Sequence, residues 1–356
     1  MILILKKIIR KLSERNGEPL LVNGKLDSFQ NPKKVLLLRQ DRIGDVLVSI
    51  AFLKKLRVIL PDSQIDIVLS HRNKSAQFAI KESIDNSFVL EKRIAAYFKI
   101  LSELRKQEYD IVIDLLDNAS STSSILTSFT KAKIKLGFEK ENRKVYSHIV
   151  RLPNKKENHI IERLNSLLLP FAGNVKNEES LSFNLSFDSQ SKAIDLLGVK
   201  SKKFRLGINL SGSDDSKNWG TGNYIGFIET LETLKEKLEV KVFTTKSNEK
   251  QLNEITENVP NAAAPFVNSF EQFTAMMSTC DIILTPDTSV VHLCSAFNIP
   301  CIALYTYSNN PNVGMPWEPR SKHSKALKIS DKETLGLIKI TDVLVALNQI
   351  IEEISD

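Results

Sequence analysis

Apolar runs of strand length alternate with amphipathic segments of helix length along almost the whole chain. In the first half, the pattern predicts strands at residues 35–39, 65–70, 87–91, 110–114 and 134–138. It predicts helices at residues 45–60, 93–107, 119–130 and 158–171. Strands that alternate with helices are typical of βαβ units, which build a parallel sheet.

The second half repeats this architecture after a polar stretch. Residues 172–190 have the composition of a loop, so we expect a domain boundary there, with residues 1–180 in one domain and 181–356 in the other. Further strands are predicted at 204–209, 240–244, 282–285 and 301–305, and further helices at 224–238, 248–258, 270–279, 288–297 and 333–354. The expected fold is α/β, with two Rossmann-like domains facing a cleft and the last helix free to pack back on the first domain.

The first motif is RQDRIGDVLV, where a buried strand runs through a turn containing Gly44 into a helix. Doubly wound sheets bind ligands at this end of their strands. Asp45 opens the helix, where free amides favour negative charge. That position also suits a base that takes a proton from a sugar hydroxyl. Arg39 and Arg42 are either solvated or hold anionic groups of an acceptor, and Gly44 permits close backbone approach.

Two more motifs follow strands of the second half. LGINLSGSDDSKNW puts Lys217 in a loop of small residues, which is either a surface turn or a clamp for a diphosphate. DIILTPDTSVVHLCSAF joins a buried strand to a helix whose first amides can bind an anion. Asp287 and His292 in this segment each have a structural alternative, as a helix cap and as a core histidine.

Together these segments resemble glycosyltransferase family 9, the ADP-heptose:lipopolysaccharide heptosyltransferases. The resemblance covers about residues 33–350 and is carried most specifically by RQDRIGDVLVSIAFLKKLR and DIILTPDTSVVHLCSAFNIPCIALY, with matches also at NHIIERLNSLLLPFAG and LGINLSGSDDSKNW. The resemblance implies a GT-B fold. It also implies a reaction that inverts the anomeric carbon of the donor sugar in a single displacement, without a metal or a cofactor. It also implies ADP-heptose as the donor and a lipopolysaccharide core or similar lipid-linked, anionic glycan as the acceptor.

The resemblance also implies roles for individual residues. Asp45 corresponds to the general base that deprotonates the acceptor hydroxyl. The residues implied to bind the donor are Ser213, Lys217, Glu249, Asp287, Thr288, Ser289 and His292. Among them, Lys217 and the amides of Thr288 and Ser289 correspond to the diphosphate clamp, and Glu249 to the acid on the donor ribose.

The chain departs from the family pattern at several positions. Ser289 replaces a usual glycine, Val290 and Val291 replace a pair that contains proline, and Gly220 replaces a proline after Trp219. YTYSNNPNVGMPWEP replaces a glycine-containing loop after the last predicted strand. These changes leave the fold in place and leave the donor's sugar and base open.

The charge of the chain is unevenly distributed. Residues 1–170 carry 31 Lys and Arg against 19 Asp and Glu, within a total net charge of +7. This basic half predicts an anionic partner or only a solvated surface. The first residues, MILILKKIIRKL, form either a docked helix or a membrane contact. Three cysteines in apolar segments favour a reducing compartment, so we expect a cytoplasmic protein. If the first residues contact a membrane, we expect the protein to lie peripherally on the inner face of the cytoplasmic membrane.

Other classes explain the sequence less well. A nicotinamide-dependent oxidoreductase would need a Gly-x-Gly-x-x-Gly turn, which neither RQDRIGD nor NLSGSDD contains. The sequence lacks a nucleic-acid-binding motif despite its pI of about 9.1, so no nucleic-acid partner is expected. A transferase that uses another nucleotide sugar, or a catalytically silent sugar-binding protein, stays open as an alternative.

Overall fold

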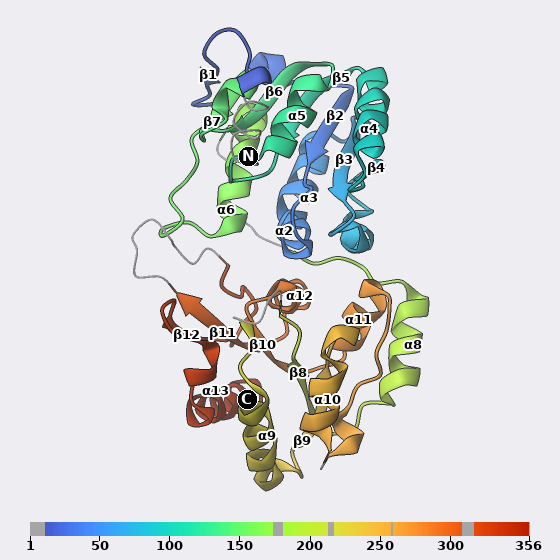
Figure 1. Cartoon of the computed structure of the whole chain (residues 1–356), viewed down its shortest axis with the longest axis vertical. Coiled ribbons are helices and arrows are strands. Elements are labelled where there is room, and N and C mark those ends of the chain that lie inside the picture. Colours follow the sequence, from blue (N-terminus) through green and yellow to red (C-terminus); the bar gives the residue numbers. More distant parts are fainter. Residues whose placement is uncertain (1–10, 174–180, 213–216, 258, 308–316, 356) are drawn as a thin grey trace. The chain divides into compact units, whose positions relative to one another are not determined.

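The structure is a computed structural model that describes residues 11–173, 181–212, 217–257, 259–307 and 317–355. The chain divides into two compact units, Met1–Ser180 and Leu181–Asp356. In Figure 1, the first unit runs from blue to green and the second from yellow-green to red. Each unit has its own parallel sheet and its own helices, as the alternation of strands and helices predicts.

The first sheet is wholly parallel, with the strand order β1-β7-β6-β5-β2-β3-β4. Its strands are β1 (Leu20–Leu21), β2 (Lys34–Leu38), β3 (Gln64–Ser70), β4 (Asn86–Leu90), β5 (Tyr109–Asp114), β6 (Ala132–Phe138) and β7 (His148–Val150). The chain goes from β2 to β3 and β4 and then returns to β5 on the other side of β2. The strand order therefore reverses at β2, and such a reversal opens a crevice at the carboxyl ends of the strands.

The α-helices of the first unit lie at the four predicted segments, and short 3-10 turns accompany them. Together they are η1 (Asp27–Phe29), α2 (Ile43–Val48), α3 (Ile50–Ile59), η2 (Lys74–Ile80), α4 (Ile94–Gln107), α5 (Ser121–Phe129), η3 (Arg143–Val145), α6 (Ile160–Asn165), η4 (Ser166–Leu168) and α7 (Leu169–Ala172). The segment predicted as one helix at 158–171 is divided into α6, η4 and α7. Helices α4 and α5 cover one face of the sheet, because Leu104 and Leu126 join Leu36, Leu38 and Val112 in one buried cluster.

The second sheet is also parallel, with the order β12-β11-β10-β8-β9. Its strands are β8 (Phe204–Asn209), β9 (Leu238–Phe243), β10 (Ile282–Pro286), β11 (Cys301–Tyr307) and β12 (Lys325–Ser330). The helices are α8 (Phe187–Leu197), α9 (Thr221–Thr230), η6 (Leu231–Leu234), η7 (Lys246–Asn248), α10 (Glu249–Thr256), η8 (Pro260–Ala262), α11 (Phe270–Met277), α12 (Ser289–Phe297), η9 (Leu335–Leu337) and α13 (Ile340–Ser355). Here the strand order reverses between β8 and β10.

Alternate residues of the second sheet serve two separate cores. Ile282 and Leu284 pack with residues of α9, α10 and α13, whereas Ile283 packs with residues of α8, α11 and α12. Because successive side chains of a strand point to opposite faces, this sheet is covered by helices on both faces. Helix α13 thus packs on its own unit, through buried residues such as Leu347 and Ile350.

The predicted helix 45–60 is in fact two helices, and the break has a local cause. The backbone carbonyl oxygen of Asp45 accepts hydrogen bonds from Arg39 Nε at 2.8 Å and from Ser49 Oγ at 2.7 Å. The backbone N–H of Ser49 donates instead to the carbonyl of Val46, at 3.1 Å. Side-chain donors thus displace the helical hydrogen bond at this turn. The pattern also missed β1, β7, α8 and β12, and α13 starts at Ile340 rather than at 333.

Two further findings bear on the sequence analysis. All three cysteines, Cys280, Cys294 and Cys301, are buried and free. Within the described ranges, no helix is both long enough and apolar enough to cross a bilayer.

Candidate active site

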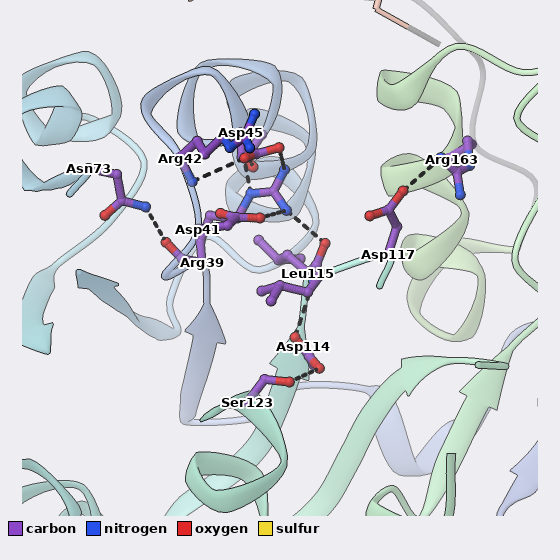
Figure 2. A network of polar contacts seen from close by, with 12 residues as sticks. Arg39, Asp41, Arg42, Asp45, Asn73, Asp114, Leu115, Asp117, Ser123 and Arg163 are labelled. Carbon is purple, nitrogen blue, oxygen red and sulfur yellow. Dashed lines mark hydrogen bonds and ion pairs between the residues drawn. The ribbon is translucent and has the colours of Figure 1, made fainter. Parts of the chain in front are cut away.

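Each unit has a candidate site of its own, which we call a half-site, and that of the first unit is built on Arg39, which follows the central strand β2. Its side chain is only 2% exposed. Nε donates to the backbone carbonyl of Asp45 at 2.8 Å, and Nη1 donates to the carbonyl of Leu115 at 2.9 Å, beyond the end of β5. Figure 2 shows how this guanidinium joins the two loops where the strand order reverses. The side chain is buried and bonded to the protein itself, so the acceptor contact expected of Arg39 stays a prediction.

Asp45 lies in the first turn of α2 and remains partly accessible, with 16% of its side chain exposed. Oδ2 accepts a hydrogen bond from the backbone N–H of Arg42 at 3.0 Å, and Oδ1 lies 3.7 Å from Arg39 Nη2. Two interactions therefore fix the carboxylate while it keeps access to solvent. Gly44 lies within α2 rather than in a preceding turn, because the helix begins at Ile43.

Asp41 is a second carboxylate at the same guanidinium, and the sequence analysis gave it no role. Its Oδ2 accepts a hydrogen bond from Arg39 Nη1 at 3.2 Å. Burial raises the pKa of Asp41 to about 7, and the nearby charges of Asp45 and Asp114 also raise it, while Arg39 opposes the shift. Arg39 is thus shared between two carboxyl groups, of which Asp41 titrates near neutral pH.

A buried polar network supports the loop after β5. Asp114 accepts hydrogen bonds from Tyr146 Oη at 2.6 Å and Ser123 Oγ at 2.8 Å, and forms an ion pair with Lys140 at 3.0 Å. It also accepts from the backbone N–H of Leu116 at 3.1 Å. Since the adjacent Leu115 carbonyl receives Arg39, this network fixes one of the acceptors that hold the guanidinium.

Two neighbouring contacts complete this half-site. Asn73 Nδ2 donates to the backbone carbonyl of Arg39 at 2.7 Å, from the loop after β3. Arg163 of α6 pairs with Asp117 at 2.8 Å, which ties the segment NHIIERLNSLLLPFAG to the loop after β5. These partners lie far from residues 39–45 in the sequence, so spacing gave no signal for them. Arg42 is exposed beside the half-site, as an acceptor-binding residue would be.

The second half-site lies at the corresponding reversal of the second sheet, between β8 and β10. Lys217, in the loop after β8, donates to the carboxylate of Asp287 at 2.7 Å and to its backbone carbonyl at 2.8 Å. Asp287 directly follows β10, and both side chains are partly exposed, at 24% and 33%. The ion pair therefore holds a cation beside the N-terminus of α12, where the helix dipole also favours an anion.

The start of α12 is fixed by side-chain hydrogen bonds. Thr288 is its N-cap, and its Oγ1 accepts from the backbone N–H of Val290 at 3.2 Å. Asn209, buried at the end of β8, donates to Thr285 Oγ1 at 3.0 Å and lies 3.4 Å from Thr288 Oγ1. Asn209 is a site residue that the motifs did not indicate, although its position at the end of a predicted strand was an available signal. Ser289, the first residue of α12, is half-buried.

The remaining predicted residues are spread around this half-site. His292 is 6% exposed on α12, with its ring centroid 6.2 Å from that of Trp317. Glu249 is exposed at the first position of α10. The neighbouring Gln251 donates to Asn218 Oδ1 and Thr221 Oγ1, both at 3.2 Å, and so links α10 to the loop that carries Lys217. Ser213 lies outside the described residues.

No group of three or more His, Cys, Asp or Glu side chains suited to a metal ion is found in the described ranges. The half-sites instead offer carboxylates and one fixed guanidinium in the first unit, and a cation with helix amides in the second. This is the chemistry of a proton acceptor and of an anion clamp, respectively.

Comparison with known proteins defines the class. The fold matches the structure of E. coli ADP-heptose lps heptosyltransferase II at a TM-score of 0.72 and 19% identity, covering 90% of this chain and 99% of that one. It matches E. coli heptosyltransferase WaaC with ADP-2-deoxy-2-fluoro heptose at 0.66 and 17% identity, covering 90% and 99%. The two parallel α/β units therefore form a GT-B fold, the fold expected from the sequence.

The sequence comparisons define the family. The profile of glycosyltransferase family 9 (heptosyltransferase) matches residues 97–339, and a family of unknown function matches residues 3–169. Lipopolysaccharide core heptosyltransferase OpsX of Haemophilus influenzae is 23% identical over 292 residues, which cover 78% of this chain and 80% of that protein. The chain belongs to glycosyltransferase family 9. It is an enzyme of the heptosyltransferase type, which confirms the resemblance inferred from the motifs.

Proposed function

We propose that this enzyme transfers a heptose or a related sugar, with inversion, from a nucleotide diphosphate to the core of a lipopolysaccharide or to a similar surface glycan. ADP-heptose is the first candidate donor, because a neighbour of the same fold is described with an ADP-heptose analogue. The lipopolysaccharide core is the first candidate acceptor, because it stands in the name of a relative. Another nucleotide sugar, with a different surface glycan, is the second candidate.

The observation that supports this proposal best is the Lys217–Asp287 pair at the N-terminus of α12. A nucleotide diphosphate gains negative charge as it leaves, and a fixed cation beside helix amides stabilises that charge. In this proposal, Lys217 and the amides at Thr288 and Ser289 hold the diphosphate, with Ser213 in the phosphate loop. Glu249 binds the ribose, and Asp287 and His292 lie toward the donor sugar.

The acceptor half of the reaction is assigned to the first unit. Asp45 accepts the proton of the acceptor hydroxyl as that oxygen attacks the anomeric carbon and the nucleotide diphosphate departs. Arg39 holds the backbone of Asp45, so the carboxylate is oriented before the acceptor binds. Arg42 and Gly44 line the acceptor side. The proposed reaction uses no metal and no cofactor.

The proposed acceptor is anionic and lipid-linked, which suits the basic first half of the chain. We place the enzyme in the cytoplasm, with peripheral contact to the inner face of the cytoplasmic membrane. The deciding experiment is a binding screen of ADP-, UDP-, GDP- and CMP-sugars against the whole protein. Binding of ADP-heptose above the others supports the proposal, and preference for another base favours the second candidate. Binding without transfer to any lipopolysaccharide core would favour a silent sugar-binding protein.

A further inference from the structure

One surface of the first unit combines exposed apolar side chains with cations. Leu12, Phe98 and Phe129 are 81%, 70% and 51% exposed. Exposed apolar side chains that gather on one surface, with polar residues around them, mark interaction sites. Leu12 precedes the first sheet, Phe98 lies in α4 and Phe129 is the last residue of α5. Helices α4 and α5 cover one face of the first sheet (Figure 1). We call this surface the α4–α5 face, and it consists of Lys11, Leu12, Arg15, Phe98, Lys99, Arg105, Lys106, Phe129 and Lys135.

Hydrogen bonds join the three segments that carry these residues. Ser128 Oγ donates to the carbonyl of Ser13 at 2.5 Å, which puts Leu12 near the end of α5 that carries Phe129. Tyr97 Oη of α4 lies 3.4 Å from Thr122 Oγ1 of α5. Residues seven apart in the sequence lie on the same side of a helix. Phe98 and Arg105 therefore share one side of α4, and Thr122 and Phe129 share one side of α5.

The cations of this face lie close enough to affect one another. Lys135 Nζ donates to the carbonyl of Ser128 at 2.9 Å. The pKa of Lys135 is lowered to about 8, first by burial and then by the positive charges of Arg15 and Arg105. A group of cations that repel one another is stabilised by an anionic ligand, because the ligand relieves that repulsion. The face therefore favours a negatively charged partner.

We propose that the α4–α5 face docks on an anionic lipid bilayer, with Leu12, Phe98 and Phe129 inserted between the headgroups and the cations on the lipid phosphates. Lys and Arg alternate with the apolar side chains, as in segments that lie in a membrane interface. Glu14 and Glu103 also lie on these segments, and Glu103 pairs with Lys99 at 3.9 Å. The excess positive charge is therefore supplied by Lys11, Arg15, Arg105 and Lys106. A second copy of this chain would bring like charges together, since the net charge is +7.

None of the residues of this face belongs to the candidate active site. The docking proposal rests on the proposed function in one respect, namely that a lipid-linked acceptor would require the enzyme to reach a membrane. The test is sedimentation of the whole protein with vesicles of phosphatidylethanolamine and phosphatidylglycerol in equal amounts, compared with vesicles of phosphatidylcholine alone. We expect binding to the anionic vesicles only, and weaker binding as salt rises. The assay contains no donor and no acceptor, so its result is independent of the donor screen.

Two variants test the residues themselves. Phe98→Ser with Phe129→Ser removes the inserted side chains, and Arg105→Glu with Lys106→Glu reverses two charges, so each double variant should weaken binding about tenfold or more. All four side chains are exposed, so their replacement should leave the packing of the core unchanged. The matched control is Phe187→Ser with Val199→Ser, at two side chains of the second unit that are 87% and 84% exposed. This control should bind like the parent.

The proposal is overturned if the double phenylalanine variant binds like the parent, or if neutral vesicles bind equally well. It is also overturned if deletion of residues 1–10 abolishes binding while both double variants retain it, because that segment would then be the anchor. Loss of self-association in the variants, without vesicle binding by the parent, would assign the face to a second copy instead. Binding of the parent to duplex DNA but not to vesicles would assign it to nucleic acid.

Discussion

Arg39 Nε donates a hydrogen bond to the backbone carbonyl of Asp45, at 2.8 Å, from a side chain that is 2% exposed. A cation of the core thus holds the first turn of the helix that presents the proposed base. Because the Asp45 carbonyl accepts this bond and one from Ser49 Oγ, it lacks its helical partner, and α2 ends at Val48. The hydrogen bond from Arg39 therefore both orients the backbone of Asp45 and helps to end the helix.

Asp45→Asn should reduce turnover by roughly 10²–10⁴-fold with little change in donor affinity, because the amide keeps an oxygen for the backbone N–H of Arg42 but cannot take a proton. Transfer kinetics and nucleotide titration measure the two effects. Asp27→Asn, in the first turn of η1, is the control and should behave like the parent. Near-normal turnover of folded Asp45→Asn would remove Asp45 from the role of base.

Asp41 should make stability depend on pH. Its pKa is raised in the folded state to about 7 from an ordinary value of 3.8, so only the folded chain holds this proton between those values. The contribution of Asp41 to stability is therefore full below about pH 4 and is lost as pH rises to about 7. Asp41→Asn lacks this loss and should gain about 4 kcal/mol relative to the parent between pH 4 and pH 8. Urea unfolding at several pH values measures it, and parallel profiles of the two proteins would contradict it.

Lys217→Ala should weaken binding of the nucleotide diphosphate by about tenfold or more and lower turnover as well, because it removes the cation at the N-terminus of α12. The matched control is Lys200→Ala. Lys200 pairs with Asp281, which precedes β10 at the opposite end from Asp287. Calorimetry with ADP and with adenosine separates phosphate binding from base binding. Equal losses for both lysines, or for both ligands, would argue against a clamp at Lys217.

Gly220→Ala should destabilise the protein by about 1–2 kcal/mol, because Gly220 has φ +100° at the N-cap of α9. Proline cannot adopt this angle, which explains in physical terms why the chain departs from the usual family residue here. Gly222→Ala is the control, since it lies inside α9 and an added Cβ meets no described atom within 4 Å. It should be neutral or stabilise the protein by up to about 1 kcal/mol. Thermal unfolding that ranks the two variants the other way would contradict this account.

The strands that carry the site could be predicted from the sequence because they are buried on both faces. Strands such as β2 and β10 appear as unbroken apolar runs, bounded by charged or turn residues. β1 has only two residues, and the strand β12 at the edge of its sheet is half-exposed, so neither has such a run. α8 leaves Ile194 and Leu196 exposed, which weakens its amphipathic pattern.

The site was predictable in part. Asp45 and Lys217 lie after the strands that the motifs indicated. The burial of Arg39 was not predictable, because an arginine in a polar turn usually points to solvent. The carbonyl groups of Asp45 and Leu115 and the carboxyl groups of Asp41 and Asp45 make its burial tolerable. Asp41 was missed for the same reason, since its raised pKa depends on surroundings that come from distant segments.

Each unit builds its half-site from its own loops at its own strand reversal and closes its own core. The two halves are therefore modular. If the proposed roles hold, substitutions that change the choice of acceptor can accumulate after β2 and β5 without disturbing the proposed phosphate site after β8 and β10. Chimaeras joined between residues 173 and 181 would then recombine the acceptor and donor preferences of two relatives.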